Sequence, residues 1–261
     1  MTWTIGCATR PYDKLPFAAA CQHIAAGGFG DVAVFGGIIN STSSREEISA
    51  ARKAAADAGL SPSMLLGGTD LTESLEEGVE DFKQLIDNAA ELGVRWLLDC
   101  GIGDEAQYSN YFELMRRAAP HAQTSGVNIT MKPHGGISLT ADDLIKAYDE
   151  VSHPAFGICY DPGNIIYYTK GELRPEPFVD TIASRTTTFI IKDCVVVDGV
   201  SDVMVTPGDG LVDFDAVIGG LVAGGFSGPL YLECVGGKEL EDIDRDISAS
   251  LTFVTDILEK S

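Results

Sequence analysis

Hydrophobic and polar positions along this chain follow one repeated order: an alanine-rich helical stretch, a glycine, and then a short apolar strand. Five such segments begin at Ala25, Ala55, Ala89, Thr124 and Val222. A glycine just past a helix takes the left-handed conformation that ends the helix, and the apolar residues after it pack back onto the core. The pattern therefore predicts the helix-to-strand connections of an α/β protein.

Eight strands are predicted, and their starts lie about thirty residues apart, which is the size of one βα unit. We place them at residues 3–8, 31–36, 62–67, 95–100, 128–132, 155–161, 187–192 and 229–234. Helices are expected at 14–26, 44–58, 73–92, 105–125, 140–151, 173–184, 213–224 and 240–259.

No break in composition divides residues 1–261, so the alternation predicts one domain, a single (β/α)8 barrel. A doubly wound sheet is the competing architecture. Its phosphate-binding GxGxxG motif is absent after the first expected strand, which favours the barrel.

Charge and cysteine content narrow the functional classes. The chain has 18 basic and 39 acidic residues, a net charge of −21, which argues against nucleic acid as a partner. The opening residues lack a basic segment followed by an apolar one, and no apolar run reaches the length of a membrane span. Six cysteines without a CxxC motif suit reduced thiols. We therefore expect a cytoplasmic protein without a membrane partner; self-association is left open.

Candidate chemistry lies where the expected strands end. In a barrel, the carboxyl ends of the strands meet at one mouth, and catalytic residues come from them. Each expected end carries charged or polar residues after an apolar run. They are Arg10, Asp99, Lys132, His134, Asp161, Asn164, Lys192, Asp193 and Glu233.

The order of these motifs resembles a known family. KPHGG at 132–136, DPGN at 161–164, IIKDC at 190–194, TPGDGLVDF at 206–214 and GPLYLE at 228–233 are similar to the sugar phosphate isomerase/epimerase family with the xylose isomerase-like barrel. Ketose 3-epimerases, inosose dehydratases and hydroxypyruvate isomerases belong to it. The resemblance implies a small carbohydrate substrate, a keto sugar or related polyol, and proton abstraction next to its carbonyl.

The resemblance also implies a divalent metal, Mn, Mg, Co or Zn, held by Glu, Asp, His and Glu from strands five to eight. Asp161 and Glu233 match two of these ligands, so any metal would bind there. Lys132 stands in place of the first Glu, Ile190 in place of the His, and Asn164 where the family often has a further His. Because an ammonium cannot stand beside a hard cation, we expect no metal and no other cofactor.

Lys132 is then the candidate replacement for the metal, as a fixed positive charge beside a developing enediolate oxygen. Glu233 first, and Asp161 second, are the expected proton acceptors, with His134 as a further catalytic candidate. Asn164, Lys192, Asp193, Arg10 and Asp99 are expected to bind substrate. Trp3, Phe35, Tyr160, Tyr167 and Phe189 are candidates for packing against a sugar face.

Simpler interpretations stay open. Lys132 could be a purely structural ion-pair partner that fills an abandoned metal site, and His134 could be a structural residue that holds its loop. Lys192 could form a structural pair with Asp193. Two alternative functions also remain: a lysine Schiff-base aldolase or dehydratase, and a non-catalytic sugar-binding subunit. We expect a neutral polyhydroxy carbonyl compound rather than a doubly phosphorylated one, because the acidic chain repels anions.

Overall fold

The computed structural model describes residues 3–261, and its centre is a closed barrel of eight strands in the order β1-β10-β7-β6-β5-β4-β3-β2. Every neighbouring pair in the barrel is parallel. The strands are β1 (Ile5–Ala8), β2 (Asp31–Val34), β3 (Ser61–Leu66), β4 (Trp96–Asp99), β5 (Asn128–Met131), β6 (Phe156–Tyr160), β7 (Thr186–Ile191) and β10 (Leu230–Leu232). The prediction of a single (β/α)8 barrel is confirmed.

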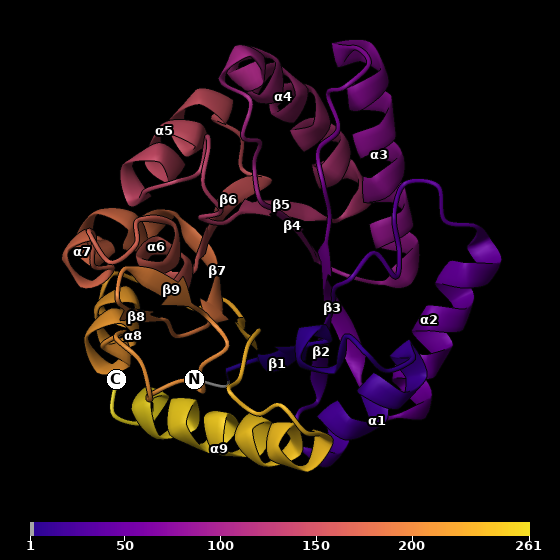
Figure 1. Ribbon diagram of the computed structural model, residues 1–261. Helices are drawn as coiled ribbons and strands as arrows, with labels where there is room; N and C mark the ends of the chain where they lie inside the picture. Colours follow the sequence, from indigo (N-terminus) through magenta and orange to yellow (C-terminus); the bar gives the residue numbers. More distant parts are fainter. Residues whose placement is uncertain (1–2) are drawn as a thin grey trace.

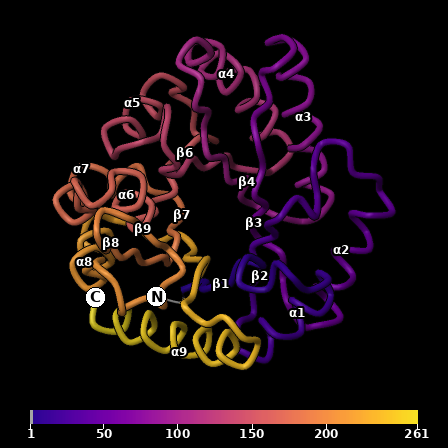
Figure 2. The backbone as a smooth tube through the Cα atoms, viewed as in Figure 1, coloured from indigo at the N-terminus to yellow at the C-terminus, as the bar shows by residue number. Residues whose placement is uncertain are grey.

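Helices surround the barrel, and the chain passes once around it in sequence order (Figures 1 and 2). The last helix, in yellow, packs beside the first, in indigo, which completes the outer layer. The helices are α1 (Phe17–Ala26), α2 (Arg45–Asp57), α3 (Leu75–Leu92), α4 (Tyr108–Ser125), α5 (Ala141–Val151), α6 (Pro162–Tyr168), α7 (Val179–Ile182), α8 (Phe214–Ala223) and α9 (Leu240–Leu258). Among the helices of residues 3–261, none is both long and apolar enough to cross a membrane.

The glycines of the repeated pattern end helices as predicted. Gly28, Gly59, Gly93, Gly126 and Gly225 have φ between 74° and 96°, the left-handed region that other residues rarely adopt. Strand residues two apart share a face, so each barrel strand divides its side chains between two apolar layers. The smaller layer fills the barrel interior and comprises Ala8, Ala33, Phe35, Met64, Leu98, Cys159, Ile190 and Tyr231.

The region after β6 differs from the prediction. A helix was expected at 173–184, but α6 begins at Pro162, directly after the strand. Asp161 caps it by accepting a hydrogen bond from the Asn164 backbone N–H at 3.0 Å, and a proline at the first helical position suits a helix start. Prolines in the later segment leave only short turns there, the 3-10 turn Glu176–Phe178, α7, and the 3-10 turn Ala183–Arg185.

A two-stranded hairpin, β8 (Val195–Val197) and β9 (Val200–Asp202), was also missed. Its turn is Asp198-Gly199, with φ of 52° and 76°. Asp-Gly between two apolar runs is a strong hairpin signal, because both turn positions need positive φ. The hairpin follows the carboxyl end of β7 and packs against α6.

Candidate active site

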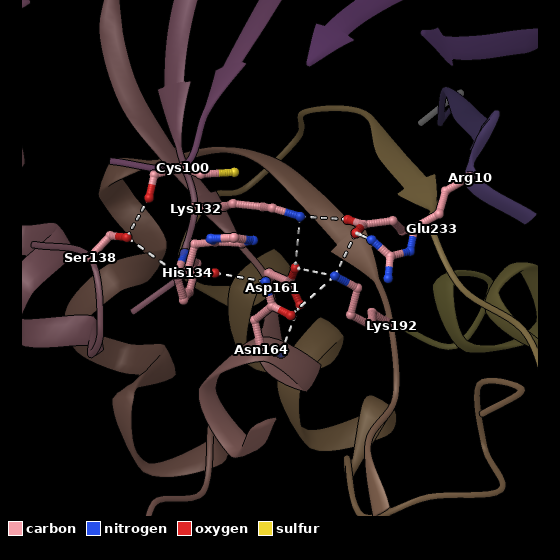
Figure 3. Close-up of polar contacts among 10 residues, drawn as sticks. Arg10, Cys100, Lys132, His134, Ser138, Asp161, Asn164, Lys192 and Glu233 are labelled. Carbon is pink, nitrogen blue, oxygen red and sulfur yellow. Dashed lines mark hydrogen bonds and ion pairs between the residues drawn. The ribbon is translucent and has the colours of Figure 1, made fainter. Parts of the chain in front are cut away.

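Four charged residues each occupy the first position after a barrel strand. Lys132 follows β5, Asp161 follows β6, Lys192 follows β7 and Glu233 follows β10. These four strands are neighbours in the barrel, so positive and negative residues alternate along its rim. Because every strand is parallel, all four side chains project from the same end (Figure 3). We call them the ion-pair cluster.

Within the ion-pair cluster, each lysine contacts both carboxylates. Lys132 Nζ lies 2.7 Å from Glu233 Oε2 and 3.5 Å from Asp161 Oδ2. Lys192 Nζ lies 2.6 Å from Glu233 Oε1 and 3.1 Å from Asp161 Oδ2. All four side chains are at most 3% exposed. The four charges balance, which allows so many ionised groups to be buried together.

The cluster fixes the protonation states of its members. Burial works against the charged form of Lys132, but the carboxylates of Glu233 and Asp161 outweigh it and raise the pKa of Lys132 well above its usual value. Burial likewise works against ionised Glu233, yet Lys132 and Lys192 hold the pKa of Glu233 well below its usual range. Lys132 is therefore an ammonium and Glu233 a carboxylate across the physiological pH range.

Asn164 links the cluster to the loop after β5. Its Oδ1 accepts a hydrogen bond from Lys192 Nζ at 3.1 Å, and its Nδ2 donates to the Pro133 carbonyl at 2.7 Å. Helix α6 can approach this closely because residue 163 is glycine: a Cβ there would lie 2.7 Å from the Lys192 carbonyl oxygen. Asn164 therefore positions the lysine rather than lining an open surface.

Asp193 does not pair with Lys192, so that interpretation of the sequence is wrong. Its fully buried carboxylate accepts four backbone hydrogen bonds, from Cys194 and from three residues of the glycine loop at 206–212. The closest loop contact is the Gly210 N–H at 2.8 Å, and a Cβ on Gly210 would clash with this carboxylate. Asp193 holds the loop, and its backbone fixes the end of β7, so we do not retain it as a substrate contact.

Asp99 also has a structural environment instead of the expected substrate contact. It is fully buried and accepts hydrogen bonds from Tyr111 Oη at 2.7 Å, Thr69 Oγ1 at 2.8 Å and the Gly101 N–H at 2.7 Å. Burial raises its pKa, although these three donors oppose the shift. Both oxygens are occupied, so Asp99 secures the end of β4.

His134 lies at the mouth on a rigid loop. Its backbone N–H donates to the Ser138 carbonyl and hydroxyl, both at 3.1 Å, and the Ser138 hydroxyl donates to the Cys100 carbonyl at 2.7 Å. The residue is exposed, and within residues 3–261 no side chain hydrogen-bonds to its ring nitrogens. Partial burial of the ring, and then the nearby ammonium groups of Lys132 and Lys192, lower the pKa of His134. The imidazole is therefore neutral at pH 7 and free to accept a proton.

Tyr168, which was not singled out from the sequence, packs against His134. The two ring centroids are 5.0 Å apart with an interplanar angle of 52°. Burial raises the pKa of Tyr168 to about 12, so its hydroxyl stays protonated. Tyr168 is the last residue of α6, and placing that helix directly after DPGN would have brought it to the mouth.

A cavity of about 920 Å³ lies beside the cluster. Arg10 and Phe35 line it and also face the cluster, because Arg10 Nη1 is 3.9 Å from Glu233 Oε1 and the Phe35 ring centroid is 5.8 Å from Lys132 Nζ. Thr9 joins the two loops by exchanging hydrogen bonds with the backbone of Phe35.

Of the five aromatic candidates for a sugar face, Phe35 alone lines this cavity within the described part of the chain. Tyr160 and Phe189 point outward from their strands into the layer under the helices, because their neighbours Cys159 and Ile190 point inward. Trp3 stacks on Phe226 with centroids 6.1 Å apart. The proposed packing role is wrong for these three.

The residues present do not fit the divalent metal that the resemblance implies. Two ammonium groups contact the two carboxylates that remain of the ligand set, and Ile190 is buried in the barrel interior. Between residues 3 and 261, no group of three or more His, Cys, Asp or Glu side chains could hold a metal ion. A hard cation needs several free oxygen ligands and is repelled by neighbouring ammonium groups.

Fold and site together define a (β/α)8 barrel with its charged centre at the strand carboxyl ends. The chain belongs to the family described as xylose isomerase-like TIM barrel, which matches residues 21–256. The family assignment made from the sequence is thus confirmed. A comparison with curated proteins finds no match.

Solved structures share the fold over nearly the whole chain. A xylose isomerase-like TIM barrel protein from Mycobacterium smegmatis, in complex with magnesium, has a TM-score of 0.78 at 19% identity and covers 98% of both chains. A D-psicose 3-epimerase with D-tagatose, from Clostridium cellulolyticum H10, has a TM-score of 0.79 at 14% identity, covering 98% of this chain and 99% of the other. A probable 3-DHS dehydratase from Bacillus anthracis has a TM-score of 0.72 at 13% identity, with 98% and 99% covered.

Proposed function

We propose that this protein is an isomerase, epimerase or lyase that removes a proton next to the carbonyl of a keto sugar or related polyol, without a bound metal. The observation that carries the proposal is the ion-pair cluster, in which Lys132 takes the place of a metal ligand and contacts Asp161 and Glu233. The family supports the carbohydrate class, since its structural neighbours include a sugar epimerase and a probable dehydratase.

The two lysines have different roles. An ammonium has three N–H donors. Those of Lys192 are directed to Asp161, Asn164 and Glu233. Within residues 3–261, Lys132 has only the two carboxylates as partners, and it lies beside Phe35, which lines the cavity. Lys132 therefore keeps a donor for the substrate, and a preorganised positive charge there stabilises the oxygen that becomes negative as the proton leaves. Lys192 positions the carboxylates.

His134 is the proton acceptor in this proposal, in place of Glu233, which we expected from the sequence. A general base works best when its pKa lies near the working pH. The pKa of Glu233 is held far below that range by two ammonium groups. His134 is neutral and lies at the mouth, and its ring nitrogens form no hydrogen bond with a side chain in the described part of the chain.

The Schiff-base alternative is disfavoured by the same contacts. A lysine that attacks a carbonyl must be neutral part of the time, which requires apolar surroundings or a neighbouring cation to lower its pKa. Lys132 has the opposite surroundings, with carboxylates at 2.7 and 3.5 Å, and its pKa is raised.

A non-catalytic sugar-binding subunit is the second candidate, and one observation favours it. The cluster side chains are at most 3% exposed and satisfy one another almost completely, as expected of an ion pair that fills a former metal site. Such a protein would bind a sugar in the cavity but would exchange no proton with it.

Deuterium exchange separates the two candidates. Protein treated with EDTA is incubated in D₂O with a panel of ketoses, ketose phosphates and keto-uronates, and deuterium at the carbon next to the carbonyl is followed by NMR. We expect incorporation by the wild type and a loss of about 10²–10³-fold in Lys132→Met. The control is Lys53→Met, which removes an exposed lysine on α2. Binding by thermal shift without any incorporation would establish the binding-subunit alternative and reject the proposal.

A further inference from the structure

Arg10 lies at the mouth without a close ion pair: among residues 3–261, the pair found for it is with Glu233, at 3.9 Å. Two ammonium groups and two carboxylates cancel within the ion-pair cluster, and the Arg10 guanidinium stands over Glu233 with Nη1 at 3.9 Å from Oε1. Glu233 Oε1 contacts Lys192 Nζ more closely, at 2.6 Å, so its pairing with the arginine is weak. Figure 3 shows this guanidinium beside Glu233, on the side away from His134.

The other charged residues that line the cavity balance in number. Exposed Lys14 and Lys238 are matched by exposed Asp13 and Glu239. The buried carboxylates of Asp99 and Asp193 accept hydrogen bonds from other donors, which hold the end of β4 and the glycine loop. Arg10 is therefore the cavity cation that a bound anion could pair with.

Arg10 is also placed to recognise a ligand. It lines the cavity of about 920 Å³, and its side chain is 46% exposed. Its position is fixed because it begins the short 3-10 turn Arg10–Tyr12, with Pro11 next, and the preceding Thr9 is tied to Phe35. A guanidinium has a planar fork of donors that matches a carboxylate with two parallel hydrogen bonds.

We infer that the substrate carries one carboxylate, which binds Arg10, so that the keto sugar or polyol of the proposed function is a sugar acid. A carboxylate matches the guanidinium fork with one negative charge, whereas a phosphate dianion would bring a second negative charge close to Glu233. In a chain of net charge −21 an anion is otherwise repelled, so the exposed guanidinium is the feature that favours its binding here. This inference rests on the proposed function and changes the neutral substrate expected from the sequence.

The test compares ligands that differ only in the carboxylate. Binding of D-fructose, D-fructuronate and D-fructose 6-phosphate, and of the equivalent D-tagatose and D-sorbose series, is measured by calorimetry at low and physiological ionic strength. We expect at least one uronate to bind at least tenfold more tightly than its neutral parent and more tightly than the phosphate. Arg10→Gln should abolish the preference, and Arg10→Lys should restore part of it.

The matched control is Arg95→Gln, an exposed arginine just before β4 at the opposite end of the barrel, which should keep the full preference. Equal binding of a sugar and its uronate overturns the inference, as do tighter binding of the phosphates, failure of every uronate to bind, and an unchanged preference in Arg10→Gln. Deuterium exchange with neutral ketoses alone would reject the carboxylate but leave the proposed function standing. Uronate binding without deuterium exchange would reject the proposed function but leave the carboxylate site at Arg10 standing.

Discussion

Lys192 Nζ lies 2.6 Å from Glu233 Oε1, although Asp193 is its neighbour in the sequence. The side chain of Lys192 points into the barrel mouth, while the carboxylate of Asp193 turns away to hold the glycine loop. Successive residues of an extended chain point to opposite sides, so adjacency in the sequence separates these two charges. The same contact makes Glu233 a structural anion with a depressed pKa.

Lys192→Met should destabilise the protein by about 3–5 kcal/mol, because it leaves buried carboxylates without one of their two partners. Urea denaturation measures the free energy of unfolding. Lys53→Met, which breaks an exposed pair on α2, should cost less than about 1 kcal/mol. Adding Glu233→Gln to Lys192→Met should recover part of the loss. A cost no larger than that of the control would show that the cluster does not stabilise the fold.

Restoring the family's ligands should create a metal site. Lys132→Glu with Ile190→His and Lys192→Met returns a carboxylate and an imidazole beside Asp161 and Glu233 and removes both repelling ammonium groups. We expect this variant to bind about one equivalent of Mn²⁺ or Mg²⁺ by calorimetry and metal analysis, and the wild type to bind none at this site. One equivalent in wild-type protein purified without chelator, lost in Glu233→Ala, would contradict our interpretation of the cluster.

The rate of proton exchange should follow the ionisation of His134. A base must be neutral, and the pKa of His134 is lowered from its usual 6.5, so the rate should rise with pH below that value and level off by neutral pH. His134→Asn should lose this rising limb and about 10²–10⁴-fold in rate. The measurement is the pH profile of deuterium incorporation. A rising limb that persists in His134→Asn would assign the base to another group.

Borohydride should trap no substrate on the protein. Lys132 is held as an ammonium by Glu233 and Asp161, so it forms no imine with a keto sugar. Mass spectrometry of the reduced mixture checks this expectation, and a lysine aldolase treated in parallel shows that trapping works. An adduct mapped to Lys132 would establish the Schiff-base mechanism in place of the electrostatic one.

Asp31→Asn should stabilise the protein above pH 6. Burial at the amino end of β2 raises the pKa of Asp31 to about 6, although its hydrogen bond from Ser63 opposes the shift. A carboxyl whose pKa is raised in the folded state binds its proton more tightly there, so the wild type loses stability as pH rises from about 4 to 6. Since Asp31 is partly exposed, we expect Asp31→Asn to raise the free energy of unfolding by about 1–2 kcal/mol, less than the full pKa shift would give. Urea unfolding of the wild type and the variant at pH 4 and pH 8 measures this gain. An equal gain at both pH values would refute this account.

The sequence by itself determined the barrel and the residues at its mouth. Glycines in the left-handed conformation and short apolar runs depend on neighbours in the chain, so the alternation of helix and strand could be predicted from local pattern. The position of Lys132 after β5 and of Glu233 after β10 followed from where those runs stop. The missed elements, α6 and the Asp198-Gly199 hairpin, also had local signals, in the Asp-Pro start and the Asp-Gly turn.

Only the tertiary structure decided which charges meet. Lys192 joins Asp161 and Glu233 because closure of the barrel makes β6, β7 and β10 neighbours, and residues 161 and 233 are far apart along the chain. The role of each residue depends on these contacts. The pKa of Glu233 falls because two ammonium groups surround it, and our proposal therefore assigns the role of proton acceptor to His134. Coulomb energy depends on distance and burial, which the order of residues does not contain.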